Sequence, residues 1–396
     1  MPEETHPDIG ARIKEVRKRR GFTQRELAEA SGVSLSLIRK LEQGEKTDTR
    51  METARRLAVA LHVPTTALLV HHGEDAADAA TLDHWDGVRR ALLAPTLTGP
   101  DEPPTLRGMR EAIEAAVPLF ANDKFAELTA VLPGLLRDAN ALVDVTAEGR
   151  RVRGRLMQLA GWLMTQTRQF EAADIALARA MDDAADRLDG AATASTECWL
   201  LMRRGRVGEA RELAIRWADE AEPMRMSRAT PDELSAWGWM LLRVSAASIR
   251  DARPGEAESA LRLARSAAVA TGREWAPGGD FLRAFGPVTV ALKAAENAMV
   301  SDRPDLVLRQ AERIPKKGLR PTSNNWNRHR LDVAQAYVSQ RQYADAVGVL
   351  QEVRGNAPQW FPSQRYARDI LGQVIAKRRT LTPDMRELAD AVGLPM

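Results

Sequence analysis

The segment GFTQRELAEASGVSLSLIRKLEQG, residues 21–44, constrains the fold most, because it marks two short helices and the turn between them. Thr23 and Glu26 have the spacing of a capping box, in which each side chain bonds the backbone N–H of the other residue. Gly32 can adopt the left-handed backbone that a sharp turn needs, so the first helix ends there. Ser34 is a suitable cap for a second helix. The segment is therefore predicted to fold as helix, turn and helix.

The second helix, predicted over residues 35–43, has one polar and one apolar face when its residues are placed at 100° intervals. The apolar face carries Leu37, Ile38 and Leu41. The opposite face carries Leu35, Ser36, Arg39, Lys40 and Gln43. Two helices at such a turn, with polar and basic side chains on the second, have the layout that places a recognition helix in the major groove of DNA.

The net positive charge of the chain lies at its N-terminal end. Residues 1–72 hold 13 Lys and Arg against 10 Asp and Glu, whereas the remaining residues carry equal numbers of both signs. Residues 9–25 alone hold seven basic residues and a single acid, Glu15. A cluster this dense attracts a polyanion, with nucleic acid as the first candidate. The alternative is an ordinary solvated helix face.

The spacing T-Q-x-E-L-A-x-x-x-G-V-S-x-x-x-I-x-x-L-E-x-G resembles the Cro/phage-repressor type of helix-turn-helix, also called the xenobiotic response element family. The resemblance runs from Ile9 to about Leu69 and includes the later LAVALHVPTTALL. It implies a five-helix DNA-binding domain over residues 1–72. The partner that it implies is a double-stranded DNA operator.

The family pattern, carried onto this sequence, implies a set of DNA contacts and one structural pair. Arg17 would pair with Glu42 and brace the first helix against the end of the recognition helix. Leu35 stands where a polar side chain is frequent, so the operator sequence is not predicted. The implied DNA-binding residues are Gln24, Arg25, Ser34, Leu35, Ser36, Arg39, Lys40, Gln43, Lys46 and Arg50. Within this set Gln24 would meet a phosphate at a helix N-terminus.

Residues 73–105 are acidic and then proline-rich, with one short amphipathic helix predicted over 85–93. This composition is typical of a stiff, extended connector. Residues 106–396 are predicted to be helical throughout, and the helix starts at Thr230 and Thr382 are well marked by the sequences that follow them.

The body is repetitive. Gly161, Ala173, Leu177 and Ala180 have the same spacing as Ala334, Ala346, Leu350 and Val353, and weaker relatives centre on Ala210, Ala257 and Val307. Small residues at such positions let two helices cross closely, and the pattern resembles the tetratricopeptide repeat. The chain is therefore predicted to be all-α, with a repressor-type head joined to an α-solenoid of tetratricopeptide-like hairpins.

This arrangement is similar to bacterial transcriptional regulators that include peptide-pheromone receptors. The resemblance implies that the inner face of the solenoid binds an effector, either a signalling peptide or a small molecule. The residues expected on that face are Arg155, Gln158, Trp162, Gln166, Arg328 and Gln335. A solvated surface with a core tryptophan is the alternative.

No catalytic, cofactor-binding or metal-binding pattern stands out in the sequence. Cys198, the only cysteine, is expected to be a small buried apolar residue. His71 and His72 are expected in a solvated loop, and His329 as a structural or groove residue. No apolar run approaches the roughly 20 residues of a membrane span, and no signal peptide is evident, so a cytoplasmic location is expected.

The function that these features favour is a homodimeric, ligand-responsive transcriptional regulator. Two recognition helices would meet two half-sites of an operator, and an effector in the body would change their spacing. The first alternative is a scaffold or antitoxin-like partner whose repeats hold another protein. The second is an enzyme with an unrecognised site in the helical body.

Overall fold

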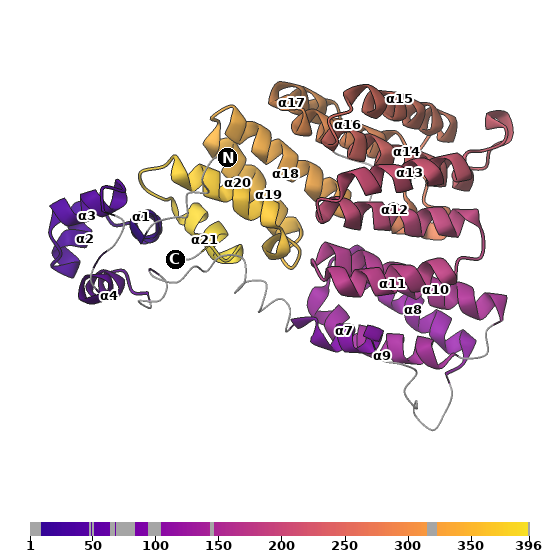
Figure 1. Cartoon of the computed structure of the whole chain (residues 1–396), viewed down its shortest axis with the longest axis horizontal. Helices are drawn as coiled ribbons and strands as arrows, with labels where there is room; N and C mark the ends of the chain where they lie inside the picture. The colour runs from indigo at the N-terminus through magenta and orange to yellow at the C-terminus, as the bar shows by residue number, and fades with distance from the viewer. Residues whose placement is uncertain are drawn as a thin grey trace. The chain divides into compact units, whose positions relative to one another are not determined.

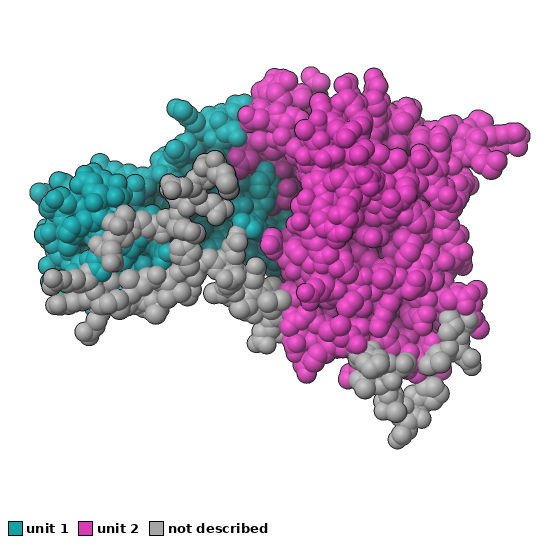
Figure 2. Space-filling model, viewed as in Figure 1, with its two compact units in different colours: residues 1–80, 337–396 teal, residues 81–336 magenta. Residues whose placement is uncertain are grey.

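The computed structural model describes residues 9–46, 49, 51–63, 68, 84–93, 104–142, 146–314 and 323–394. Within these residues the regular structure is helical, apart from one isolated antiparallel bridge between Trp275 and Phe285. The all-α fold class is therefore confirmed for the part of the chain that is described. The chain divides into two compact units, shown in two colours in Figure 2. Unit 1 comprises residues 1–80 and 337–396, and unit 2 comprises residues 81–336.

The N-terminal segment of unit 1 has four described helices, which pack around a common apolar core. A fifth helix, expected from the resemblance, falls beyond Val63, where only Leu68 is described. The side chains of Ile13, Leu27, Ile38 and Leu41 are fully buried in this core. The helices are α1 (Ile9–Arg19), α2 (Gln24–Ser31), α3 (Leu35–Glu42) and α4 (Met51–Ala60) (Figure 1).

The residues predicted to cap α2 and α3 form the expected hydrogen bonds. The Thr23 backbone N–H donates to Glu26 Oε2 at 2.7 Å, and the Glu26 N–H donates to Thr23 Oγ1 at 3.2 Å. Gly32 ends α2 with φ +63°. The Ser34 side chain accepts a hydrogen bond from the Leu37 N–H at the start of α3. These bonds satisfy N–H groups that a helix leaves unpaired, so they set where each helix begins.

A buried ion pair joins α1 to the end of α3. Arg17 Nε donates to Glu42 Oε1 at 2.6 Å, and Arg17 Nη2 donates to Glu42 Oε2 at 2.8 Å. Gln24 Nε2 also donates to Glu42 Oε2, at 2.8 Å. The same arginine reaches the connection between α1 and α2, where its Nη1 donates to the Phe22 carbonyl. One carboxylate thus fixes α1, α2 and α3 relative to one another.

Unit 1 also contains the C-terminal helices α19 (Tyr343–Asn356), α20 (Arg365–Ala376) and α21 (Pro383–Ala391). Within this unit Lys18 Nζ donates to the Ile375 carbonyl at 3.5 Å. The sequence predicts that all residues from 106 to 396 form one body, so the grouping of the last helices with the N-terminal segment differs from that expectation. Periodicity identifies helices, but it does not show which apolar faces meet.

Unit 2 is built of consecutive helix pairs (Figure 1). The helices are α7 (Asp86–Leu93), α8 (Leu106–Ala121), α9 (Phe125–Ala141), α10 (Ala147–Gln166), α11 (Phe170–Asp182), α12 (Arg187–Arg203), α13 (Val207–Ala221), α14 (Pro231–Arg250), α15 (Pro254–Thr271), α16 (Pro287–Val300) and α17 (Pro304–Arg313). A further helix, α18 (Ser323–Ser339), crosses the division at residue 336. From α8 to α17, the first helix of each pair packs against its partner, and the successive first helices α8, α10, α12, α14 and α16 pack against one another.

The predicted short helix in the connector is α7, and it packs against α9 and α11. This part of the expected linker therefore belongs to the helical packing of unit 2. The proline-rich residues 94–103 lie outside the described residues.

The turn inside each helix pair has the same geometry. A residue with left-handed φ stands two positions before the second helix, and the N–H of the next residue bonds a carbonyl five positions earlier. This bond is the mark of a Schellman turn, which satisfies carbonyls at a helix end. The left-handed residues are Asp123, Arg168, Gly205, Ala252, Asp302 and Arg341.

The residues that were singled out as repeat anchors occupy equivalent positions. Each is the fourth residue of the second helix in its pair, and each is buried: Ala173, Ala210, Ala257, Val307 and Ala346. Leu128 takes the same position in α9, although the sequence pattern did not identify it. The periodicity of the sequence therefore corresponds to a periodicity of the structure.

A loop of residues 272–286 stands between α15 and α16 and contains the 3-10 turns η2 (Pro277–Gly279) and η3 (Phe281–Arg283). Its two ends are joined by hydrogen bonds of 2.9 and 2.8 Å between Trp275 and Phe285. The Phe285 ring is fully buried against Gly238 of α14. A Cβ atom on Gly238 would lie 2.1 Å from Phe285 Cζ, so only glycine leaves room for the ring.

We expect Gly238→Ala to lower the stability of the protein by about 1–3 kcal/mol, because the added methyl group overpacks the contact with Phe285. The matched control is Gly134→Ala in α9, where a Cβ atom would meet nothing within 4 Å. That change should be neutral or stabilising by up to about 1 kcal/mol, because alanine favours the helix. Thermal unfolding followed by circular dichroism measures both. Equal melting temperatures would contradict the packing of Phe285 on Gly238.

Replacing Arg17 by Met should destabilise the N-terminal helices by about 3–5 kcal/mol, because Glu42 would remain buried without its cation. Arg39→Met is the control, since Arg39 lies exposed on α3, and it should change stability by less than about 0.5 kcal/mol. Amide hydrogen exchange of peptides from α1, α2 and α3 reports this local effect in the full chain. Unchanged exchange in the Arg17 variant would show that the pair does not hold these helices.

Candidate nucleic-acid interface and interior pocket

The predicted recognition helix α3 exposes four of the five side chains that the sequence places on its outer face, and Leu35 is the exception. Ile38 and Leu41 are buried, and Leu35 is half-buried. Because this apolar stripe is fixed in the core, the neighbouring positions must face outward. The exposed members of the predicted DNA-binding set are Arg25, Ser34, Ser36, Arg39, Lys40, Gln43 and Lys46. Arg50 lies outside the described residues.

The basic end of α1 is less available than its sequence suggests. Arg17, Lys18 and Arg19 are all buried. Arg17 is paired with Glu42, and Arg19 forms an ion pair with Glu15 on the same helix. Burial lowers the pKa of Lys18, and burial lowers the pKa of Arg19 to about 10. Part of the charge cluster expected to attract a polyanion therefore belongs to the interior of unit 1.

Gln24 has a different contact from the one expected. Its amide nitrogen donates to Glu42 Oε2, so the side chain is held at the ion pair of α1 and α3. The exposed surface beside it is contributed by Arg25. A contact between Gln24 and phosphate stays a prediction.

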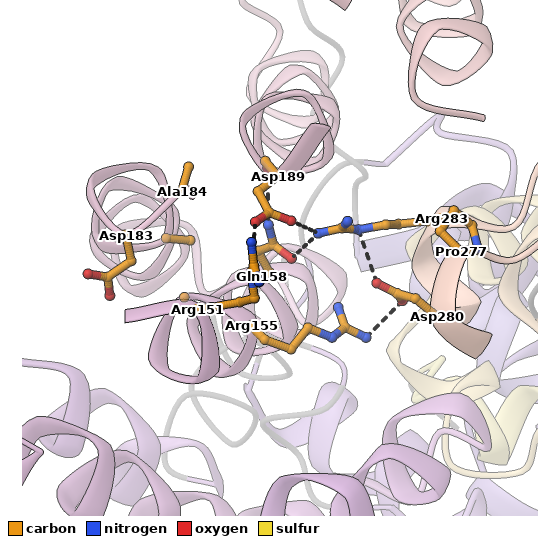
Figure 3. Close-up of a pocket in the computed structure, with 12 residues that line it drawn as sticks. Arg151, Arg155, Gln158, Asp183, Ala184, Asp189, Pro277, Asp280 and Arg283 are labelled. Carbon is orange, nitrogen blue, oxygen red and sulfur yellow. Dashed lines mark hydrogen bonds and ion pairs between the residues drawn. The ribbon is translucent and has the colours of Figure 1, made fainter. Parts of the chain in front are cut away.

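A pocket of about 270 Å³ lies within unit 2, between α10, α11, the start of α12 and the 272–286 loop (Figure 3). Its polar wall is formed by charged and amide side chains. These are Arg151, Arg155 and Gln158 of α10, Asp183 directly after α11, Asp189 of α12, and Asp280 and Arg283 of the loop.

The loop is tied to this wall by a chain of hydrogen bonds and ion pairs. Arg155 Nη2 donates to Asp280 Oδ1 at 2.7 Å, and Arg283 Nε lies 3.2 Å from Asp280 Oδ2. Arg283 Nη2 donates to Asp189 Oδ1 at 2.8 Å and to Gln158 Oε1 at 3.3 Å. Burial lowers the pKa of Arg155, although Asp280 acts in the opposite direction. Figure 3 shows these side chains meeting between the helices and the loop.

The structure brings together only part of the predicted effector face. Arg155 and Gln158 line the pocket, and Trp162 makes an edge-to-face contact with Phe281 of the same loop, with ring centroids 5.5 Å apart. Gln166 instead donates to Asn324 Oδ1 at 3.0 Å.

The two predicted effector residues of α18, Arg328 and Gln335, do not line this pocket. Arg328 Nε lies 3.9 Å from Asp332 Oδ1 on the same helix. Gln335 is half-buried and does not line this pocket. The predicted set of six therefore does not line this pocket as a whole, and a shared effector face stays a prediction.

Sequence reasoning missed the loop residues of the pocket. The signal that could have indicated them is the long separation between the repeat anchors Ala257 and Val307, which leaves extra residues between two helices. That separation predicts an insertion, but it does not show which helix the insertion contacts.

Cys198 and His329, two further titratable residues considered in the sequence, are both buried. Burial raises the pKa of Cys198 to about 12, as expected for a thiol in an apolar interior. His329 is also buried, which lowers its pKa to about 4. Among the described residues no group of three His, Cys, Asp or Glu side chains could hold a metal ion. His71 and His72 lie outside those residues.

In the described part of the chain, none of the helices has the length and apolar character needed to cross a membrane.

Comparison with known proteins identifies the N-terminal segment. A family model described as helix-turn-helix matches residues 13–68. The HTH-type transcriptional regulator SinR of Bacillus licheniformis is 30% identical over 86 residues, which cover 22% of this chain and 78% of that relative. The SinR protein of Bacillus subtilis (strain 168) is 30% identical over 85 residues, which cover 22% of this chain and 77% of that relative. The matched helices carry the exposed face of α3 and the Arg17–Glu42 pair. The chain therefore belongs to the helix-turn-helix family of DNA-binding transcriptional regulators, which are not enzymes.

Proposed function

We propose that this protein is a homodimeric regulator that reads a specific operator and responds to an effector bound by its helical body. The observation that carries the proposal is the geometry of α3. Its buried stripe and the Glu42 carboxylate hold the helix, while Ser36, Arg39 and Lys40 are exposed together on the opposite face.

The proposed docking places α3 in the major groove, with its first residues toward base edges. Arg39 and Lys40 can donate hydrogen bonds to guanine or phosphate, and Ser36 can donate or accept. Leu35 supplies an apolar contact of the kind that a thymine methyl group accepts. Arg25 and Lys46, both exposed, would position the helix through phosphate contacts. Arg50 and Gln43 complete the proposed contact set.

A homodimer is proposed because one short helix reads only a few base pairs. Two copies of α3 would meet half-sites about one helical turn, roughly 34 Å, apart. A dimer reads two half-sites and is therefore more specific than one DNA-binding domain. A change in the helical body that alters the distance between the two copies of α3 would alter the affinity for the operator.

The body is proposed to be a tetratricopeptide-like array that serves as the effector domain. Six successive Schellman turns and the six buried side chains at equivalent positions support this assignment. Repeated helix pairs of this kind present one side of their first helices to a ligand. Arg155, Gln158 and Trp162, all on α10, remain the proposed effector residues that lie at or beside one pocket.

We expect Arg39→Ala and Lys40→Ala each to weaken operator binding by about tenfold or more, corresponding to roughly 1–3 kcal/mol. The loss follows from removing an exposed donor without disturbing the buried stripe of α3. Fluorescence anisotropy of the full chain with its own upstream DNA and with a shuffled duplex measures the effect at several salt concentrations.

The control for this prediction is Arg107→Ala in α8, because Arg107 is exposed and pairs only with Glu111 on its own helix. That variant should bind the operator like the wild type. If neither α3 variant loses affinity while the wild type discriminates the two duplexes, the docking of α3 is wrong. If the wild type binds both duplexes equally, the proposed sequence specificity is wrong.

A further inference from the structure

In the pocket beside the 272–286 loop, most acceptor atoms already have partners within the protein, whereas some donor atoms do not. The oxygens of its three carboxylates already have cationic partners. Asp183 is held at both oxygens by Arg153, with distances of 2.6 Å. Asp280 is held by Arg155 and Arg283. These two carboxylates have little capacity left for a ligand.

Asp189 is engaged more loosely, because only one of its oxygens accepts a hydrogen bond. Its Oδ1 accepts from Arg283 Nη2 at 2.8 Å, and its Oδ2 lies 4.0 Å from Arg151 Nε. The Gln158 amide nitrogen is also used, because it donates to the Thr193 hydroxyl at 2.9 Å and to the Asp189 carbonyl at 3.1 Å. Most acceptors of the wall therefore have hydrogen bonds from within the protein.

The donors of the wall are not exhausted. Arg155 Nη1 is buried and has no hydrogen-bond partner. Arg151 has only its long contact with Asp189, and its side chain is 64% exposed. A buried guanidinium nitrogen without an acceptor is costly, because it has lost water without gaining a partner. What the pocket lacks is an acceptor, preferably a charged one.

The charges of the residues that line the pocket also favour an anionic ligand. Asp183 is neutralised by Arg153, which does not line the pocket. Three arginines then face two carboxylates: Arg151, Arg155 and Arg283 against Asp189 and Asp280. Burial also lowers the pKa of Arg155, so an additional anion would stabilise its charged form.

The loop shows how an anion is bound here. The Asp280 carboxylate lies between the guanidinium groups of Arg155 and Arg283 (Figure 3). Arginine binds carboxylates well because its planar donors match the two oxygens. The volume of about 270 Å³ lies just below the roughly 300 Å³ at which small-molecule pockets begin. The space therefore suits a ligand the size of one or two amino-acid residues.

We propose that this pocket binds a small carboxylate-bearing effector, whose carboxylate accepts hydrogen bonds from Arg155 Nη1 and from Arg151. The proposal rests on the effector-responsive function proposed above and specifies the chemical class of the effector. The ligand's neutral part would occupy the space between α10, α11 and the loop.

The test is isothermal titration of the full-length protein, without DNA, with N-acetyl-aspartate, N-acetyl-leucine and succinate at up to about 20 mM, since weak ligands bind in the millimolar range. We expect at least one of these carboxylates to bind. Its neutral amide counterpart should bind about tenfold more weakly or not at all, because the charge-assisted hydrogen bonds are lost. Inorganic phosphate is titrated as a second type of anion.

Arg155→Gln should weaken binding of the carboxylate by about tenfold, whereas Arg107→Gln on α8 should leave it unchanged. If Arg155→Gln fails to fold, Arg151→Gln is the second variant, because Arg151 is mostly exposed and contributes only one long contact to the fold. It should weaken binding by about threefold or more.

The inference is overturned if none of the carboxylates binds, if acid and amide bind equally, or if the arginine variant that folds does not lose affinity. Binding of phosphate alone would also overturn the assignment to a carboxylate. Operator binding is measured separately with the anisotropy assay. Failure of the titration with intact operator binding removes only this inference, whereas absence of operator binding removes the proposed function.

Discussion

A helix leaves its first N–H groups and its last C=O groups unpaired, and the way this chain satisfies them determines most of its structure. In the N-terminal segment Thr23, Glu26 and Ser34 bond the free N–H groups of α2 and α3. In the helix pairs a left-handed residue closes each turn with the same backbone bond. Because every pair turns in the same way, the successive first helices from α8 to α16 can pack on one another.

The 272–286 loop is the longest connection between helices among the described residues, and it also satisfies the end of a helix. Glu274 accepts hydrogen bonds from the Val288 and Thr289 N–H groups at the start of α16. The loop thereby caps α16 while its other residues reach helices earlier in the chain. Its carbonyl groups accept from Ser235 and Trp239 of α14, and its Asp280 binds Arg155 of α10.

Local features were predictable because their cause lies within a few residues. The caps at Thr23, Ser34, Thr230 and Thr382 are read from side-chain spacing, and each bonds the backbone as its spacing indicates. Contacts over a long separation were not predictable from the residues alone, and the Arg17–Glu42 pair was expected only through the family resemblance. Asp280 and Arg155 are 125 positions apart. The burial of Lys18 and Arg19 depends on tertiary packing, which a run of basic residues does not reveal. The sequence alone therefore overestimates the positive charge that is exposed to DNA.

The position of Asp280 has a consequence for how an effector would act within unit 2. The Arg155 guanidinium holds the loop through Asp280, and a ligand carboxylate would draw on the donors of the same group. Sharing the positive charge of this arginine between two carboxylates would weaken the link between α10 and the loop. The loop also bonds α14 and caps α16, so a change at Arg155 is passed to two further helix pairs through contacts that already exist. An effector needs to alter only one ion pair to bias the packing of several pairs, because each pair rests on the next.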